Sequence, residues 1–189
     1  MKTAICTLQS VTAYSQNRAI QSEKKNKESA ADWERRCWRE RMHVNSSGNV
    51  VIPAMAFKHV LADIAAYLSE KIKGKGNNTW TKHFQSGVLP MADVDTGYKA
   101  SDVQGEVISV PIDGKRGGKS RVPKTFPVIP KWSGQIEFHI GDDSITEEVF
   151  KRYLTQAGYL IGVGRWRARN GGLYGRFEVK SIKWKDDRS

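Results

Sequence analysis

The sequence predicts an α+β fold, because stretches with the two-residue period of strands alternate with stretches that have the period of helices. Apolar and polar side chains alternate along residues 3–12, 135–140 and 177–184. Residues 50–73 and 144–161 instead repeat apolar side chains every three or four positions. With further strand-like residues after the first helix, the order becomes strand, helix, two strands, helix, strand. This order indicates a split βαβ unit, so we expect a ferredoxin-like (RRM-like) sheet.

Length and composition favour one soluble domain. The 189 residues fit a single domain, 1–189, with insertions at 14–49 and about 74–134. Hydrophobic residues make up 39% of the chain, which is too many for a disordered protein. No apolar run reaches the ~18 residues that span a bilayer, and the first residues lack the apolar core of a signal peptide. Cys6 and Cys37 are too few for a disulfide scaffold. We therefore expect a cytoplasmic protein with no membrane partner.

The first strand, 3–12, places Ala4, Cys6 and Leu8 on one face, and a long charged insertion follows it. Between Asn17 and Arg41 the insertion holds eight Lys or Arg and five Asp or Glu residues. The segment AADWERRCWRER within it predicts a short helix.

The first long helix is expected to begin near Pro53, which suits a first turn, and to end at Gly74 and Gly76. Its apolar stripe consists of Phe57, Val60, Leu61, Ile64, Leu68 and Ile72. For the second helix, Ser144 followed by Glu147 is a capping-box pattern that predicts the start.

The segment 74–134 is expected to be irregular, with strand-like pieces at 87–94 and 106–112. Between the second piece and the strand at 135–140 lies DGKRGGKSRVPK, which reads as a basic hairpin tip. It carries five cations against Asp113 alone. Such a tip is suited to holding a nucleic-acid strand, and a solvated loop is the alternative.

Net charge gives the first indication of function. Lys and Arg number 31 against 20 Asp and Glu, so the net charge is +11 and the pI is about 9.7. A domain this basic is typical of proteins that bind polyanions, although a basic surface also serves solubility alone.

The segment GVGRWRARNGGLYGR at 162–176 combines glycines, four arginines and no acidic residue. Glycines allow a backbone to approach phosphates, and arginines bind them bidentately. Trp166 and Tyr174 between the cations are suited to stacking on unpaired bases. Neither a Walker nor a Rossmann loop is present, because no GK[ST] follows and the order is helix then strand. The alternative is an arginine-rich turn that only joins two elements.

Side chains for catalysis are sparse. His43, His59, His83 and His139 lack metal-ligand spacing, and no GxSxG motif is present. Cys37 lies among arginines that would lower the pKa of its thiol, but packing beside a tryptophan is the favoured role. We expect no cofactor, no metal and no enzyme activity.

Three segments resemble the RAMP superfamily of CRISPR proteins. VVIPAMAFKHVLADIA resembles its "IPGSSLKGALR" element, and GVGRWRARNGGLYGRFEV resembles its G-rich loop. YSQNR at 14–18 looks like the "SSQ" turn in backbone subunits of CRISPR effector (Cascade-type) complexes. The chain departs from the pattern in being short and in having AMAFKH where the family has small residues and Arg. These departures favour an alternative, in which the chain is a solitary, phage-borne relative in antiviral defence rather than a working effector subunit.

The resemblance implies an RRM-like palm, a thumb-like hairpin at 113–124 and single-stranded guide RNA as ligand. It also implies partners, either further copies in a head-to-tail oligomer or CRISPR effector subunits. By position, the expected RNA-binding residues are Ser15, Gln16, Arg18, Lys58, Lys115, Arg116, Lys119, Arg121, Gly164, Arg165, Trp166, Arg167, Arg169, Gly172, Tyr174 and Arg176.

Two alternatives to a non-catalytic RNA-binding protein stay open. One is an anti-CRISPR protein that mimics a backbone subunit and binds the effector. The other is a metal-dependent ribonuclease that uses Asp32, as some relatives cut target RNA with an aspartate after the first strand. Salt bridges from Asp32 to neighbouring arginines are the favoured role of this residue.

Overall fold

The structure, a computed structural model, describes residues 1–111 and 120–186. The strands are β1 (Lys2–Ser10), β2 (Tyr14–Ser15), β3 (Asn49–Ile52), β4 (Val88–Pro90), β5 (Val94–Lys99), β6 (Gln104–Pro111), β7 (Arg121–Ile129), β8 (Ser133–Ile140) and β9 (Phe177–Asp186). The α-helices are α1 (Ala30–Cys37), α2 (Ala54–Leu68), α3 (Trp80–Gly87) and α4 (Glu147–Gln156). Two 3-10 turns, η1 (Trp38–Arg41) and η3 (Ala168–Asn170), and one π-helical turn, η2 (Ala157–Ile161), complete the elements. Within the described residues, every helix is too short or too polar to cross a membrane.

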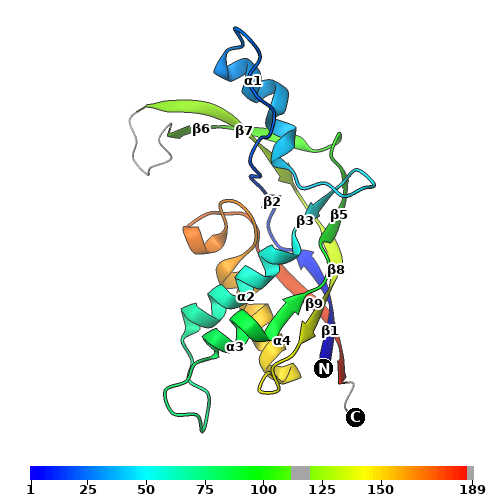
Figure 1. Ribbon diagram of the computed structural model, residues 1–189, viewed down its shortest axis with the longest axis vertical. Coiled ribbons are helices and arrows are strands. Elements are labelled where there is room, and N and C mark those ends of the chain that lie inside the picture. Colours follow the sequence, from blue (N-terminus) through cyan, green and yellow to red (C-terminus); the bar gives the residue numbers. More distant parts are fainter. Residues whose placement is uncertain (112–119, 187–189) are drawn as a thin grey trace.

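A four-stranded antiparallel sheet with the order β4-β8-β1-β9 forms the lower part of the molecule (Figure 1). β1 lies between β8 and β9, so that Lys2 pairs with Ile140 on one side and Asp186 on the other. With α2 before β4 and α4 before β9, this is the ferredoxin-like arrangement. The predicted fold class is confirmed.

The helices cover one face of this sheet, with α2, α3 and α4 all on the same side of β1, β8 and β9 (Figure 1). Alternation along β1 places Ala4, Cys6 and Leu8 fully in the core, as expected from the sequence. From the helices, Phe57 and Phe150 are also fully buried, and the Phe150 ring lies 5.2 Å from that of Phe138. Burial of each such side chain contributes about 1.5–3 kcal/mol, so this apolar layer stabilises the sheet.

A second antiparallel sheet, β2-β7-β6, carries α1 at the upper end of the molecule (Figure 1). The predicted helix in the charged insertion is present as α1 followed by η1. A buried ion pair attaches this segment to β7. The Arg41 guanidinium lies 2.8 Å from the Glu34 carboxylate, which also accepts a 3.0 Å hydrogen bond from the Thr125 amide.

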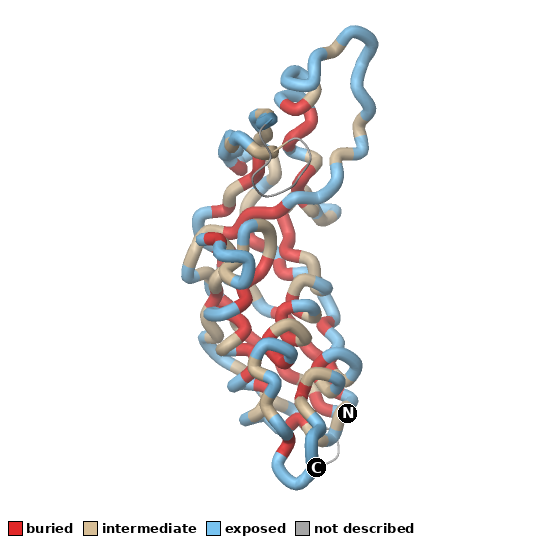
Figure 2. The backbone as a smooth tube through the Cα atoms, turned by 90° about the vertical axis from the view of Figure 1, so that its left-hand side faces the viewer, coloured by how far each residue is buried: buried red, intermediate tan, exposed pale blue. Residues whose placement is uncertain are grey.

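The upper and lower parts of the molecule also differ in how far their residues are buried. Buried backbone runs through the middle and lower parts of the tube in Figure 2, whereas the loop at the upper end is mainly exposed. The small sheet of β3 and β5 contributes Val50, Ile52 and Val94 to the core.

The first long helix ends earlier than the sequence predicts. α2 stops at Leu68, because Ser69 adopts the left-handed conformation with φ 50°. The next residue, Glu70, accepts hydrogen bonds from α4, at 2.6 Å from Arg152 and 3.0 Å from the Tyr153 hydroxyl. The predicted end at Gly74 and Gly76 is therefore wrong. Ile72 lies in the loop after the helix, and its side chain is buried there.

Two other local predictions are also wrong. The segment expected to be irregular after residue 74 contains α3, whose Phe84 packs 4.6 Å from the ring of Tyr153. The cap of α4 is Thr146, whose hydroxyl accepts a hydrogen bond from the Val149 amide at 3.3 Å. Ser144 instead accepts a 2.8 Å hydrogen bond from Lys75, so it does not cap the helix.

Candidate nucleic-acid interface

Three segments that lie far apart in the sequence meet at one cleft of about 430 Å³. They are the turn at β2, the beginning of α2 and the glycine-rich loop between η2 and β9. The same three segments carry the motifs noted in the sequence. The cleft is lined by Tyr14, Gln16, Asn17, His43, Pro53, Ala56, Gly164, Arg165, Trp166 and Asn170.

The glycine-rich loop is packed tightly against β2. Gly164 has φ +82°, and a Cβ atom there would lie 2.3 Å from the Ser15 carbonyl oxygen. Gly175 has φ +78°, and its Cβ would lie 1.8 Å from the Val163 carbonyl oxygen. Only glycine fits both the left-handed backbone and the close approach. These glycines therefore shape the loop so that β2 and the loop contact each other directly.

Several of the loop amides are hydrogen-bonded within the protein. Arg165 N donates to Ser15 O at 2.7 Å, and Val163 N donates to Gly175 O at 2.9 Å. Gly172 is buried, and its amide donates to Arg167 O at 3.1 Å. The amides of Val163, Arg165 and Gly172 are therefore not free to bind phosphate.

Arg165 is held in place by an aromatic ring and a hydroxyl. Its guanidinium carbon lies 3.7 Å above the centroid of Phe126, and Nη1 donates to the Ser15 hydroxyl at 3.4 Å. The side chain is half-buried, and this desolvation lowers the pKa of Arg165. Among the described residues it has no ion-pair partner. Glu106 is the carboxylate whose charge acts on Arg165, but the two form no ion pair, so this desolvated and oriented cation is suited to a bidentate contact with phosphate.

Two other arginines of the loop are paired with an acid from α2. Arg167 Nη2 lies 2.9 Å from Asp63 Oδ2, and Arg169 forms an ion pair with the other oxygen of Asp63. The loop itself lacks acidic residues, but the fold places Asp63 beside it. The expectation of an unopposed cationic segment is corrected, because one carboxylate offsets part of the charge of two guanidinium groups.

The aromatic residues of the loop differ in exposure. Trp166 is 49% exposed, and its ring lies 6.2 Å from that of Tyr174 in an edge-on arrangement. Tyr174 donates a 2.7 Å hydrogen bond to Glu106 on β6, and this contact together with burial raises the pKa of Tyr174. Trp166 is thus the ring that is free to stack on a base, while Tyr174 ties the loop to β6.

Two of the predicted RNA-binding residues, Ser15 and Gln16, are buried, and only Gln16 lines the cleft. Ser15 is fully buried and positions Arg165 through its carbonyl and hydroxyl oxygens. Gln16 is 3% exposed and lines the cleft. Its Oε1 accepts hydrogen bonds from the His43 amide at 3.3 Å and the Tyr14 hydroxyl at 3.4 Å.

The other predicted residues lie outside the cleft. Lys58 is half-buried and directs Nζ to the Val88 carbonyl at 3.5 Å, and Arg176 donates from Nε to Tyr159 O at 3.2 Å. Arg18 is exposed near the cleft. At the base of the hairpin, exposed Arg121 donates to Ser109 O at 2.5 Å. Three predicted thumb cations fall outside the described residues, namely Lys115, Arg116 and Lys119.

Sequence reasoning missed three residues at this site. His43 lines the cleft, and burial together with the charge of Arg18 lowers the pKa of its imidazole, with Asp93 opposing the effect. Phe126 forms the platform for Arg165, and Arg41 lies 5.0 Å from the same ring. No local pattern marks these residues, because they come from strands and turns distant in the sequence.

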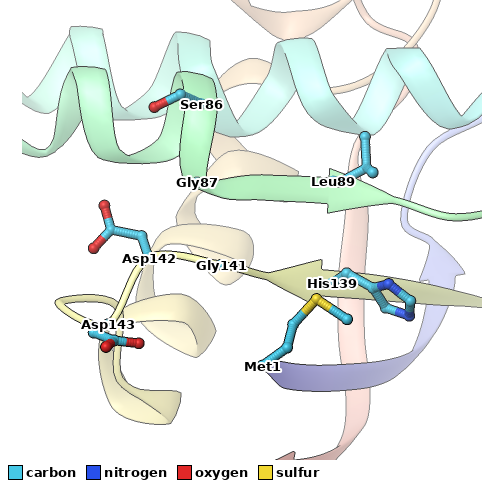
Figure 3. A pocket seen from close by; sticks show the side chains of 8 residues that line it. All are labelled: Met1, Ser86, Gly87, Leu89, His139, Gly141, Asp142 and Asp143. Carbon is cyan, nitrogen blue, oxygen red and sulfur yellow. The ribbon is translucent and has the colours of Figure 1, made fainter.

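A second, larger cavity of about 700 Å³ lies at the opposite end of β8 (Figure 3). Asp142 and Asp143 line one side of it, with Met1, Leu89 and His139 on the other. Burial tends to raise the pKa of Asp142, but hydrogen bonds from the Ser144 amide and from His83 at 2.5 Å lower it overall. Ionised aspartates repel phosphate, so this cavity does not suit a polyanion.

The uncovered face of the four-stranded sheet also lacks the features of an RRM surface. Its half-buried and exposed positions on β1 and β8 are Thr3, Ile5, Thr7, Gln9, Ser133, Gln135, Glu137 and His139. None of these side chains is Phe, Tyr or Trp, whereas RRM proteins stack bases on aromatic residues of this face. The expected ligand site is thus at the cleft rather than on the sheet.

Asp32 serves the local structure of α1. Its carboxylate accepts a 2.7 Å hydrogen bond from the Ser29 hydroxyl and lies 2.7 Å from Arg35 Nη1. These contacts lower the pKa of Asp32. Across residues 1–111 and 120–186, no group of three or more His, Cys, Asp or Glu side chains is arranged to hold a metal ion. The described residues therefore offer no ligand set for the metal-dependent ribonuclease alternative.

Neither family models nor curated protein sequences match this chain. Among solved structures, it resembles the crystal structure of Cmr6 from Pyrococcus furiosus, with a TM-score of 0.51. The two share 15% sequence identity over 95% of this chain and 99% of that chain. The chain has the fold of Cmr6. At this identity the likeness shows the fold alone, and membership of the RAMP superfamily stays a prediction from the three motifs. A Cascade-type backbone role and a phage origin stay predictions.

Proposed function

We propose that this protein is a RAMP-type RNA-binding protein that holds single-stranded RNA across the cleft between β2, α2 and the glycine-rich loop. One observation carries the proposal. The three segments that resemble RAMP motifs, separated by more than 100 residues of chain between β2 and the loop, line one cleft that contains the Arg165 guanidinium. The fold shared with Cmr6 and the net charge of +11 support the same conclusion.

Arg165 is the principal phosphate ligand in this proposal. Phe126 and Ser15 fix its guanidinium group before RNA arrives, so little side-chain entropy is lost on binding. Half-burial leaves the guanidinium partly desolvated, and such a group forms strong charge-assisted hydrogen bonds with phosphate oxygens. Trp166 beside it provides a stacking surface for a base of the same strand.

Arg167 and Arg169 contribute less to phosphate binding than Arg165 does. Both are engaged with Asp63, so a phosphate must compete with that carboxylate for their hydrogen bonds. The cluster of two guanidinium groups and one carboxylate nevertheless keeps a net positive charge. It attracts the RNA backbone over the Debye length of about 8 Å at physiological salt.

The biological context is proposed from the same resemblance. The RNA is a guide RNA, and the partners are further copies of this chain along the strand or subunits of a CRISPR effector. No catalytic step is included. The anti-CRISPR alternative differs in requiring an effector complex but no tight binding of free RNA.

The test of the site is a titration of a fluorescein-labelled 20-nucleotide single-stranded RNA, followed by anisotropy at several salt concentrations. We expect Arg165→Ala to weaken binding by about tenfold, or about 1.4 kcal/mol. The slope of log K against log salt should fall by about 1, as for loss of one phosphate contact. Arg152→Ala on α4, which removes the same charge far from the cleft, is the matched control. Equal affinity of the two variants would contradict the assignment of the cleft.

Self-association needs a separate measurement. Light scattering of the purified protein at low salt, before and after RNase A, gives the mass of any assembly. A large assembly that RNase A dissolves supports copies arranged along RNA. An RNA-free monomer contradicts that arrangement, and a pull-down against CRISPR effector subunits then tests the protein-interaction alternative.

A further inference from the structure

A buried amide in the wall of the cleft lacks a hydrogen-bond partner. Gln16 is 3% exposed, and among the described residues its Nε2 has no acceptor. Buried polar groups are nearly always paired in native proteins, so an unpaired donor in a cavity wall indicates a ligand group that completes it. The Gln16 side chain is therefore a second, independent feature of the cleft beside its positive charge.

The orientation of this amide follows from its neighbours. The His43 backbone N–H can only donate, and it lies 3.3 Å from the terminal oxygen of Gln16. If the amide were turned over, two donors would face each other. Oε1 must therefore point to His43, which leaves both N–H groups of Nε2 without an acceptor among the described residues.

Arg165 adds a second set of donors to the cleft, whose wall also includes the amide side chains of Asn17 and Asn170. The Arg165 guanidinium carries only donors, and Trp166 offers its exposed ring beside it. A flat ligand that enters the cleft lies among the donors of Gln16 and Arg165, which line it together with Trp166. It binds best when its edge carries acceptor oxygens.

We propose that the cleft receives one unpaired nucleobase and selects a base that carries a ring carbonyl oxygen (uracil, guanine or cytosine) over adenine, through the donors of Gln16 and Arg165. This inference rests on the proposed RNA-binding function and adds base selection to it. Uracil presents O2 and O4 as acceptors, whereas the exocyclic amine of adenine is a donor and meets the donors of the cleft. Base edges, rather than phosphates, give sequence preference.

Gln16→Glu is the sharpest variant. Glutamate has the same shape and keeps an oxygen for the His43 amide, but it removes the Nε2 donors. Its added negative charge weakens binding of every RNA, so the informative quantity is the ratio of affinities for two RNAs. Gln135→Glu on the uncovered face of β8 makes the same charge change at an exposed position away from the cleft.

The experiment measures Kd for 12-nucleotide oligouridine and oligoadenosine with each protein at one salt concentration. We expect the parent protein to prefer oligouridine, Gln16→Glu to reduce that preference at least fivefold, and Gln135→Glu to leave it unchanged. Adenosine runs stack on themselves, so a preference in the parent alone does not support the inference; its loss in Gln16→Glu does.

Two outcomes would overturn the inference, and they are distinguishable. If Gln16→Glu binds RNA with the parent's ratio, the cleft does not read the base and the proposed function stands. If the parent binds neither oligomer, the RNA-binding function fails and base selection fails with it. Thermal melting of the variants shows whether each remains folded.

Discussion

The four-stranded sheet with its helices and the upper sheet with α1 are held together by different forces. In the lower region, which is the four-stranded sheet with its helices, Phe57, Phe138 and Phe150 form an apolar layer that is fully buried. In the upper region, which is the sheet β2-β7-β6 with α1, a buried Glu34–Arg41 pair and the Phe126 ring connect α1, η1, β7 and the glycine-rich loop. Apolar burial is not directional, whereas the polar contacts work only in one geometry. The lower region thus provides stability, and the upper region sets the geometry of the cleft.

A large effect on the stability of the whole fold is expected in the lower region. Phe150→Ala removes a fully buried ring between β8 and β9 and should lower the free energy of unfolding by about 3–5 kcal/mol. Urea denaturation followed by circular dichroism measures it. Replacement of the exposed Tyr159 by Ala is the control, with a change within about 0.5 kcal/mol. Similar losses for both variants would contradict the assignment of the core.

Breaking the buried pair in the upper region should act locally. Arg41→Met leaves the Glu34 carboxylate buried without its partner, which costs about 3–5 kcal/mol for such pairs. We expect faster hydrogen exchange in α1 and η1, with exchange in β1 and β8 unchanged. The double variant Glu34→Gln with Arg41→Met should recover part of the protection. Uniformly faster exchange over the whole chain would show that the two regions unfold together.

Replacement of Asp63 is expected to increase the affinity for RNA. Asp63→Asn removes the carboxylate that competes with phosphate for Arg167 and Arg169, so RNA binding should strengthen about threefold to fivefold, or about 0.6–1 kcal/mol. Asp102→Asn makes the same charge change at an exposed turn and should have a smaller effect. Weaker binding of Asp63→Asn would mean that Asp63 holds the two arginines in a binding position.

The smallest expected effect is a pH dependence through His43. Burial and Arg18 hold the pKa of this imidazole below its ordinary value of about 6.5. The unfolded chain therefore takes up this proton at higher pH, so the stability contributed by His43 is present above about pH 6.5 and is lost as pH falls below it. RNA phosphate favours the protonated form, so binding should strengthen modestly as pH falls from 7.5 to 5.5. His43→Gln should flatten this profile, and exposed His59→Gln should not.

Much of the lower region could be predicted from the sequence. β1, β8, β9, α2 and α4 are all present where residues 3–12, 135–140, 177–184 and the two helical stripes indicated. In these elements one face is buried, so the period of the side chains reports the structure directly. The errors are the missed helix α3 and two helix ends, where Ser69 and Thr146 rather than the expected Gly74 and Ser144 mark the limits. Contacts from Glu70 to α4 and from Lys75 to Ser144 decided those positions, and such contacts leave no local pattern.

The sequence by itself determined the α+β class, the strand and helix order, the basic charge and the three motifs that meet at the cleft. Periodicity and composition carry this information because neighbours along the chain share one element. Only the tertiary structure decided that Asp63 faces the loop, that Phe126 supports Arg165 and that the Gln16 amide lacks a partner. Each depends on residues far apart in sequence, where distance and burial, rather than spacing along the chain, set the strength of a charge or hydrogen bond.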